Sequence, residues 1–194
     1  MEFRDLLRRR RVGTLELVEQ LAVARIGATF NQYAGSELRR ARLSAYLESR
    51  AEAPLLLVGE APGYRGARIS GIPFTSERQL TGTGPAEATA TVVQSALAEL
   101  ELTEHVLLWN LVPTHPGTAS SNRRPTRAEI EESAPFLAAL SNGRRVLAVG
   151  RLAAAVTRAS YLRHPSHGGA AAFRAGLAAA TIRRRRTIVR RICA

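Results

Sequence analysis

Residues able to take part in acid–base chemistry and hydrogen bonding follow several short apolar segments of this sequence. The segment LLLVG, residues 55–59, is followed at once by Glu60, and the same loop carries an isolated aromatic, Phe74, inside GIPF. Asn110 ends the segment HVLLWN, and His164 lies in the later loop RHPSHGG. A carboxylate and an imidazole transfer protons, and a carboxamide both donates and accepts hydrogen bonds. A simple turn would account for the glycines but does not need these side chains.

The elements between these loops predict how they are brought together. Short apolar segments typical of buried strands cover residues 54–60, 105–110, 144–150 and 160–163, and helical patterns cover 85–102, 126–143, 151–158 and 170–180. Alternating strands and helices predict a three-layer α/β sandwich, with a central, mainly parallel four-stranded sheet flanked by helices. Sites in such sheets form beyond the carboxyl ends of the strands. We therefore expect the four loops to converge on one pocket.

The rest of the chain is predicted to be mostly helical. Residues 1–52 show two helical patterns, the second capped by Ser36, and the pattern Thr126-x-x-Glu129 predicts the start of another helix that ends at Gly143. Pro135 should bend that helix or break it into two. The basic tail, residues 183–194, is ambiguous. No internal repeat or linker is visible, so we expect one domain over residues 1–194.

The cysteine content limits the possible sites. The chain of 194 residues has one cysteine, Cys193. A single thiol cannot form an intramolecular disulfide, a four-cysteine iron–sulfur site or a zinc cluster. The sequence shows no secretory signal and no long apolar segment, so a cytoplasmic protein without a membrane span is expected.

The charge indicates a polyanionic partner. The formal net charge is +12, and all 28 basic residues are arginine. A codon bias toward arginine explains the absence of lysine but not the excess of positive charge. Arginine suits phosphate and base edges, so a partner rich in phosphate is expected.

The ordered motifs resemble a known family. VGEAPG, GIPF, WNLVP and RHPS occur in that order between Leu55 and Gly169. Together they resemble the uracil-DNA glycosylase superfamily, closest to the bacterial and archaeal branch that begins with GEAPG. The four cysteines that hold an iron–sulfur cluster in that branch are missing here. The resemblance implies an enzyme that flips uracil out of DNA and hydrolyses its N-glycosidic bond, releasing free uracil and leaving an abasic site.

The resemblance also implies roles for three residues. Phe74 matches the aromatic that stacks on the flipped base. Asn110 matches the asparagine that pairs with uracil N3 and O4, and His164 matches the histidine that donates to O2 as charge grows on the departing base. No metal or organic cofactor is implied. A chain without lysine cannot form a lysine Schiff base, so a monofunctional hydrolase is expected.

The loop after the first strand departs from the family pattern. Ala61 stands where the best-known branch has an aspartate that orients the attacking water. Glu60 either positions this water or points away and braces the loop. Gly63 occupies the usual position of a tyrosine that excludes the thymine methyl, and Tyr64 could wall the pocket from nearby. Gly59, Glu60 and Ala61 are expected to supply backbone amides and an acid beside the sugar. The glycines of this loop, Gly63 among them, let the backbone approach it.

Two loops are expected to contact the DNA itself. The insert after GEAPG is basic, and the loop after His164 matches one that presses against DNA. The residues assigned to DNA contact are Arg65, Arg68, Ser166, His167 and Gly168. His105 and His115 are expected to be ordinary side chains.

Two other interpretations stay open. Because the aspartate is missing, the chain could be a DNA-binding protein that recognises a flipped base without cutting it. Alternatively, GEAPG could be the phosphate turn of an unrelated nucleotide-binding domain, which the charge argues against. On the leading interpretation the partner is uracil-containing DNA, and the protein is a monomer in the bacterial cytoplasm, associated with the nucleoid through DNA.

Overall fold

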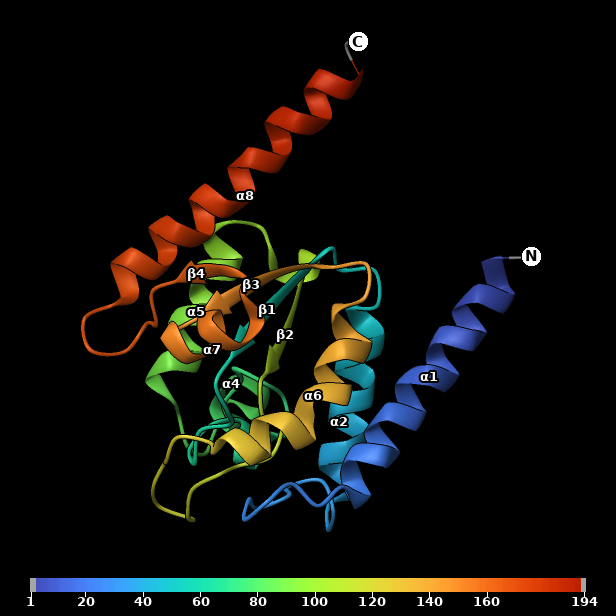
Figure 1. Ribbon diagram of the computed structural model, residues 1–194, viewed down its shortest axis with the longest axis vertical. Helices are drawn as coiled ribbons and strands as arrows, with labels where there is room; N and C mark the ends of the chain where they lie inside the picture. Colours follow the sequence, from blue (N-terminus) through green and yellow to red (C-terminus); the bar gives the residue numbers. More distant parts are fainter. Residues whose placement is uncertain (1–2, 193–194) are drawn as a thin grey trace.

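Four parallel strands form the centre of the molecule. The computed structural model describes residues 3–192, with side chains described for residues 13–181. The strands are β1 (Leu55–Gly59), β2 (Val106–Asn110), β3 (Arg145–Val149) and β4 (Ser160–Leu162), in the spatial order β2-β1-β3-β4 (Figure 1). All neighbouring pairs are parallel, and Gly59 lies opposite Asn110 in the register of β1 and β2. The predicted four-stranded sheet is confirmed.

Helices cover both faces of this sheet. They are α1 (Phe3–Val23), α2 (Glu37–Ser49), α3 (Ala67–Ser70), α4 (Glu77–Thr81), α5 (Ala88–Glu99), α6 (Arg127–Ser141), α7 (Arg151–Thr157) and α8 (Ala170–Ile192), with a 3₁₀ turn, η1, at Thr103–His105. Helices α1, α2 and α6 lie on one side of the sheet, and α5 and α8 on the other (Figure 1). The three-layer sandwich is confirmed.

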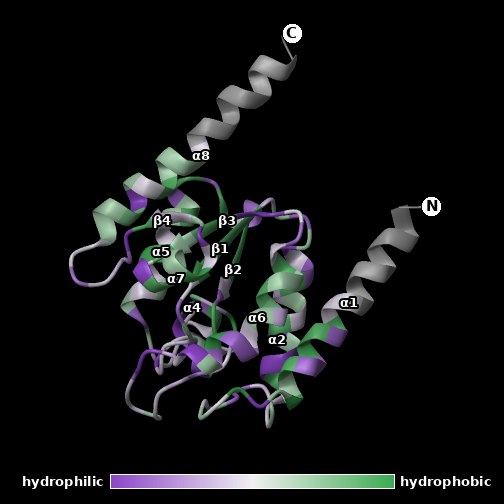
Figure 2. Ribbon diagram, viewed as in Figure 1, coloured by the Kyte–Doolittle hydropathy of each residue, from purple (hydrophilic) through white to green (hydrophobic). Residues whose placement is uncertain are grey.

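Successive side chains along each strand point to opposite faces of the sheet and so form two hydrophobic cores, one on each face. Leu56 and Val58 pack with α1 and α2, whereas Leu55 and Leu57 pack with α5 and α8. All five residues of β1 are buried, and the strands accordingly are mainly hydrophobic (Figure 2). A strand covered on both faces needs apolar residues on both, which explains why the sequence shows continuous apolar segments.

The predicted helix signals are mostly confirmed. The Ser36 hydroxyl accepts the N–H of Arg39, and Thr126 and Glu129 form a reciprocal capping box at the start of α6. The prediction of a break at Pro135 is wrong, since α6 is one continuous helix through it.

The connections differ from the sequence prediction in two places. Within residues 1–52, residues 24–36 form a loop, and Phe30 bridges to His115 after β2. The long loop after β1 contains two short helices, α3 and α4, that its glycine-rich sequence did not suggest. Most of the basic tail, residues 183–194, continues α8, but its side chains and Cys193 lie outside the described residues. Among residues 3–192, no helix combines the length and apolarity needed to cross a membrane.

Candidate functional site

The loops at the carboxyl ends of the strands enclose a cavity of about 410 Å³. Loops after β1, β2 and β4 contribute to it, together with the start of α5. Its lining consists of Glu60, Ala61, Pro62, Gly63, Ala67, Phe74, Glu87, Thr89, Asn110, Asn122, Arg123, His164, Ser166 and His167. This is the place where parallel sheets form sites, so we take it as the candidate active site.

Phe74 forms an apolar wall of this cavity. Its ring is buried and packs into the core between the sheet and α5. Its backbone has a positive φ of 52°, which is rare for a bulky residue. Neighbouring hydrogen bonds hold this conformation, since Gln94 donates to the Phe74 carbonyl at 3.2 Å and the Ser70 hydroxyl donates to the Thr75 carbonyl at 2.6 Å. Strain of this kind concentrates at functional sites.

Gly59 explains how Phe74 comes to lie beside Asn110. A Cβ at Gly59 would collide with the Phe74 ring and would lie 2.9 Å from Asn110 Oδ1. The ring and the carboxamide therefore occupy the space that a side chain at position 59 would fill. Only glycine at the end of β1 permits this arrangement.

Asn110 presents its carboxamide to the cavity. The residue is 3% exposed, yet its side chain forms no hydrogen bond with any described residue. Its amide oxygen and nitrogen are not sealed in the core but face the open space of the cavity. The free donor and acceptor are thus available to a ligand in the cavity.

His164 lies on the loop after β4 and is held in one tautomer. Its Nδ1 accepts the backbone N–H of Ser166 at 3.2 Å and contacts the Ser166 hydroxyl at 2.7 Å. Burial lowers the pKa of His164, and the positive charges of Arg163 and His167 lower it further. A neutral ring that accepts at Nδ1 carries its proton on Nε2. His164 is therefore a neutral hydrogen-bond donor in the cavity wall.

The rest of this loop is tightly constrained. His167 has a positive φ of 51°, and its Nδ1 lies 3.0 Å from the Ser166 hydroxyl. The following Gly168 is exposed with φ 73°, and a Cβ at Gly169 would collide with the His164 carbonyl. The loop presents Ser166 and His167 to the cavity, while Gly168 lies outside its lining.

Glu60 lies at the rim of the cavity. Its carboxylate is 3.8 Å from the Arg124 guanidinium, and its side chain is 35% exposed. Burial raises its pKa and Arg124 opposes the rise. Its neighbours Ala61 and Gly63 also line the cavity, but the Ala61 methyl group supplies no acid at that position.

Besides Gly168, the cavity lining does not include Gly59, Tyr64, Arg65 or Arg68, which were predicted to lie near the substrate or the DNA. Tyr64 is held through its backbone N–H, which donates to Asn122 Oδ1 at 2.9 Å. Arg65 is exposed outside the cavity. Arg68 stacks over the Phe30 ring at 4.7 Å, with its Nε buried and without a hydrogen bond. The pocket role of Tyr64 and the DNA contacts of Arg65 and Arg68 stay predictions.

Sequence reasoning missed Glu87, Thr89, Asn122 and Arg123. Arg123 donates two hydrogen bonds to Glu129, at 2.9 and 2.5 Å, and this pairing holds the pKa of Glu129 at about 2. Glu87 stands at the N-cap of α5, where an acid in the sequence indicates only a helix start. No local signal in the sequence distinguished these residues.

His115 has a structural role beside the cavity. It is fully buried, and its two ring nitrogens face the carbonyl oxygens of Pro62 and Thr118 at 2.7 and 2.8 Å. It thereby links the loop after β1 to the loop after β2, next to the cavity lining. His105, in η1, is exposed.

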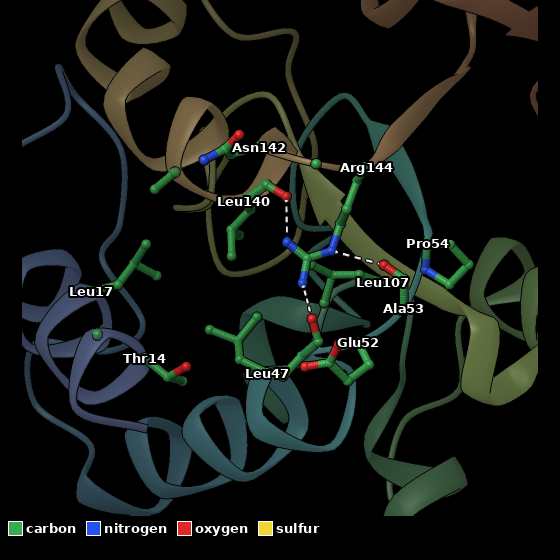
Figure 3. A pocket seen from close by; sticks show the side chains of 14 residues that line it. Thr14, Leu17, Leu47, Glu52, Ala53, Pro54, Leu107, Leu140, Asn142 and Arg144 are labelled. Carbon is green, nitrogen blue, oxygen red and sulfur yellow. Dashed lines mark hydrogen bonds between the residues drawn. The ribbon is translucent and has the colours of Figure 1, made fainter. Parts of the chain in front are cut away.

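A larger cavity of about 580 Å³ lies at the opposite, amino-terminal end of the strands (Figure 3). Leu17, Leu47, Leu107 and Leu140 contribute to its walls. The Arg144 guanidinium donates to backbone carbonyls at Ala51, Ala53 and Leu140, so it ties the segment before β1 to the end of α6. The residues that line this cavity do not bring together the amide, imidazole and aromatic groups that meet at the carboxyl ends.

Comparison with known proteins identifies the family. A sequence model of the Uracil DNA glycosylase superfamily matches residues 47–186, well over half of the chain. The chain belongs to the uracil-DNA glycosylase superfamily. The resemblance seen in the motifs is confirmed, and all of the strands and the cavity fall inside the matched region.

Comparison with solved structures supports the same fold. The crystal structure of wild-type SMUG2 from Pedobacter heparinus matches with a TM-score of 0.64 and 12% identity, covering 86% of this chain and 96% of that one. A search of curated protein sequences gave no match. Membership of the superfamily places the protein in a family of DNA glycosylases.

Proposed function

We propose that this protein is a monofunctional uracil-DNA glycosylase, which flips uracil out of DNA and hydrolyses its N-glycosidic bond. One observation carries the proposal. The unpaired carboxamide of Asn110 lies beside the Phe74 ring, and both fill the space above Gly59. A flat surface next to a free donor and acceptor suits a planar base that offers both.

Recognition would follow from these two groups. The flipped base stacks on Phe74, and the Asn110 carboxamide accepts from N3–H and donates to O4 of uracil. Cytosine presents an amino group where uracil has O4, so two donors would face each other. The pocket thus favours uracil over cytosine.

Stabilisation of the leaving group would come from His164. As the C1′–N1 bond breaks, negative charge develops on the base, and a neutral imidazole with its proton on Nε2 can donate to O2. The bond from the Ser166 N–H to Nδ1 supports this tautomer. The donor is in place before the reaction begins.

The charge of the chain supports a DNA substrate. The net charge of +12 favours binding to a phosphate backbone. We propose that the protein acts as a monomer on cytoplasmic DNA, with free uracil and an abasic site as products. No metal or organic cofactor enters this reaction.

The test is direct. The purified protein is incubated with end-labelled oligonucleotides that contain one uracil, single-stranded or paired, and then treated with alkali. We expect a break at the uracil position and none in matched oligonucleotides with cytosine there. Intact uracil-containing strands in both forms would rule out the proposal.

Ala61 favours a second candidate, a protein that binds a flipped base without cutting it. A methyl group at this position cannot orient water as a carboxylate does. Tight, uracil-dependent DNA binding without release of free uracil, measured in the same reactions, would support this candidate.

A further inference from the structure

Glu87 is an acidic side chain in the cavity that the motifs do not account for. It occupies the N-cap position of α5, but its carboxylate makes no capping hydrogen bond to the helix. Instead the carboxylate extends over the loop after β1. There it lines the same cavity as Asn110 and His164.

The Glu87 carboxylate lies against two glycines of the loop after β1. A Cβ on Gly63 would collide with Glu87 Oε1, and a Cβ on Gly66 would collide with Oε2. Any other residue at either position would displace the carboxylate. The two glycines of GYRG therefore leave open the space that the carboxylate occupies.

The Glu87 carboxylate has no protein partner. It forms no hydrogen bond or ion pair with any described residue, whereas Glu60 approaches Arg124 at 3.8 Å and Glu129 is bound twice by Arg123. Burial raises the pKa of Glu87. The carboxylate oxygens are not sealed from solvent, so water in the cavity is the partner open to them.

We propose that Glu87 is the carboxylate that binds and activates the attacking water, in place of the acid missing at Ala61. This inference rests on the proposed glycosylase function. Glu60 is less suited to the role, because it lies at the exposed rim and its carboxylate is 3.8 Å from the Arg124 guanidinium. Glu87 is the carboxylate that lines the cavity without a cation beside it among the described residues.

The chemical step balances with this residue as general base. The water oxygen bonds to C1′ of the deoxyribose while the C1′–N1 bond breaks. One water proton passes to the Glu87 carboxylate, and the bonding electron pair leaves with the uracil anion, which His164 stabilises at O2. The proton then passes through water to the anion, and the carboxylate is restored.

The experiment compares single-turnover rates of uracil release between pH 5 and 8, with enzyme in excess over DNA. Glu87→Gln keeps the size of the side chain but cannot accept a proton. We expect its rate to fall about 10²-fold or more, in the range of a general base, and the decline of the wild-type rate at acidic pH to become shallower, since only the titration of His164 then contributes to it. Glu60→Gln should lose less than about 10-fold, since Glu60 does not take the water proton in this scheme. Glu99→Gln, at the other end of α5, should match the wild type.

The possible outcomes separate the two proposals. The wild type could release uracil while Glu87→Gln shows nearly the same rate and pH profile. That result would overturn the role of Glu87 and leave the glycosylase function standing. A wild-type protein that releases no uracil overturns both. Melting curves check that Glu87→Gln is folded. If it is not, the same measurement is made on Glu87→Asp, which keeps a carboxylate. We expect this variant to release uracil more slowly but with the same decline at acidic pH. A rate independent of pH would overturn the assignment.

Discussion

The backbone N–H of Ser166 donates to Nδ1 of His164 at 3.2 Å, which leaves the ring proton on Nε2. This bond depends on a neutral ring, because a proton on Nδ1 would face the N–H donor. Burial acts in the same direction by lowering the pKa of His164. The loop after β4 therefore fixes both the charge and the tautomer of this histidine.

Folding stability should depend on the protonation of His164. Since its pKa is lowered in the folded protein, the unfolded chain binds a proton at a higher pH, near the ordinary value of about 6.5. The contribution of the neutral ring is present above that pH and is lost as the pH falls through the folded value. We expect the melting temperature of wild type, relative to His164→Gln, to decrease from pH 7.5 to pH 5. Parallel melting temperatures over this range would contradict the assignment.

Phe74 and Asn110 should act on the base rather than on the DNA backbone. Asn110→Ala removes the donor and acceptor, and Phe74→Ala removes the stacking surface. Each should lower single-turnover uracil release by about 10²-fold, the scale of one lost transition-state contact. Affinity for uracil-containing DNA, measured by fluorescence anisotropy, should change little. Asn142→Ala, at the exposed end of α6, is the control, and wild-type rates in both pocket variants would mean that the base binds elsewhere.

The fold could be predicted from the sequence because its signals are local. LLLVG and VLLWN are apolar throughout, as strands covered on both faces require, and the capping pattern of Thr126 and Glu129 predicts α6. Of the two alternatives predicted at Pro135, a bend or a break, the break is wrong because the effect of a proline depends on the packing of its helix. Phe136 and Leu137, which follow it directly, pack against the hydrophobic core, and the helix continues through the proline. Propensity is only a weak guide where packing decides.

Only those site residues that lie within a family motif could be predicted from the sequence. Asn110, Phe74 and His164 stand in recognisable motifs, and the structure brings them to one cavity. Glu87 lies in an unremarkable helix start, and its place in the cavity depends on Gly63 and Gly66, residues more than twenty positions earlier in the chain. A contact between distant segments leaves no local pattern, so only the folded structure could reveal it.

Gly59 should be irreplaceable for both packing and activity. Gly59→Ala would place a methyl group against the Phe74 ring and 2.9 Å from Asn110 Oδ1, so one of the two must move. We expect a loss of about 1–3 kcal/mol in the free energy of unfolding, as for other overpacked sites, and a fall in uracil release of about 10-fold or more. Gly35→Ala is the matched control, since nothing lies within 4 Å of its added Cβ. Equal activity in the two variants would show that the cavity wall is adaptable.

The pair of Glu129 and Arg123 should link folding stability to the shape of the cavity. Glu129 is buried, and its carboxylate binds both the Arg123 guanidinium and the N–H of Thr126. Glu129→Gln keeps a cap for Thr126 but loses the charge, and it should cost about 1–2 kcal/mol of unfolding free energy because Arg123 remains partly exposed.

The pH dependence of this cost follows from the pKa of about 2 for Glu129. Its contribution is complete above the ordinary glutamate value of about 4.3 and is lost as the pH falls toward the folded value. In urea unfolding, the difference between wild type and Glu129→Gln should therefore be constant from pH 7 to 5 and shrink below pH 4. Glu131→Gln, which removes an exposed pair with Arg127 on the same helix, should leave the free energy of unfolding nearly unchanged at every pH. Because Arg123 lines the cavity, Glu129→Gln should also slow uracil release, whereas Glu131→Gln should not.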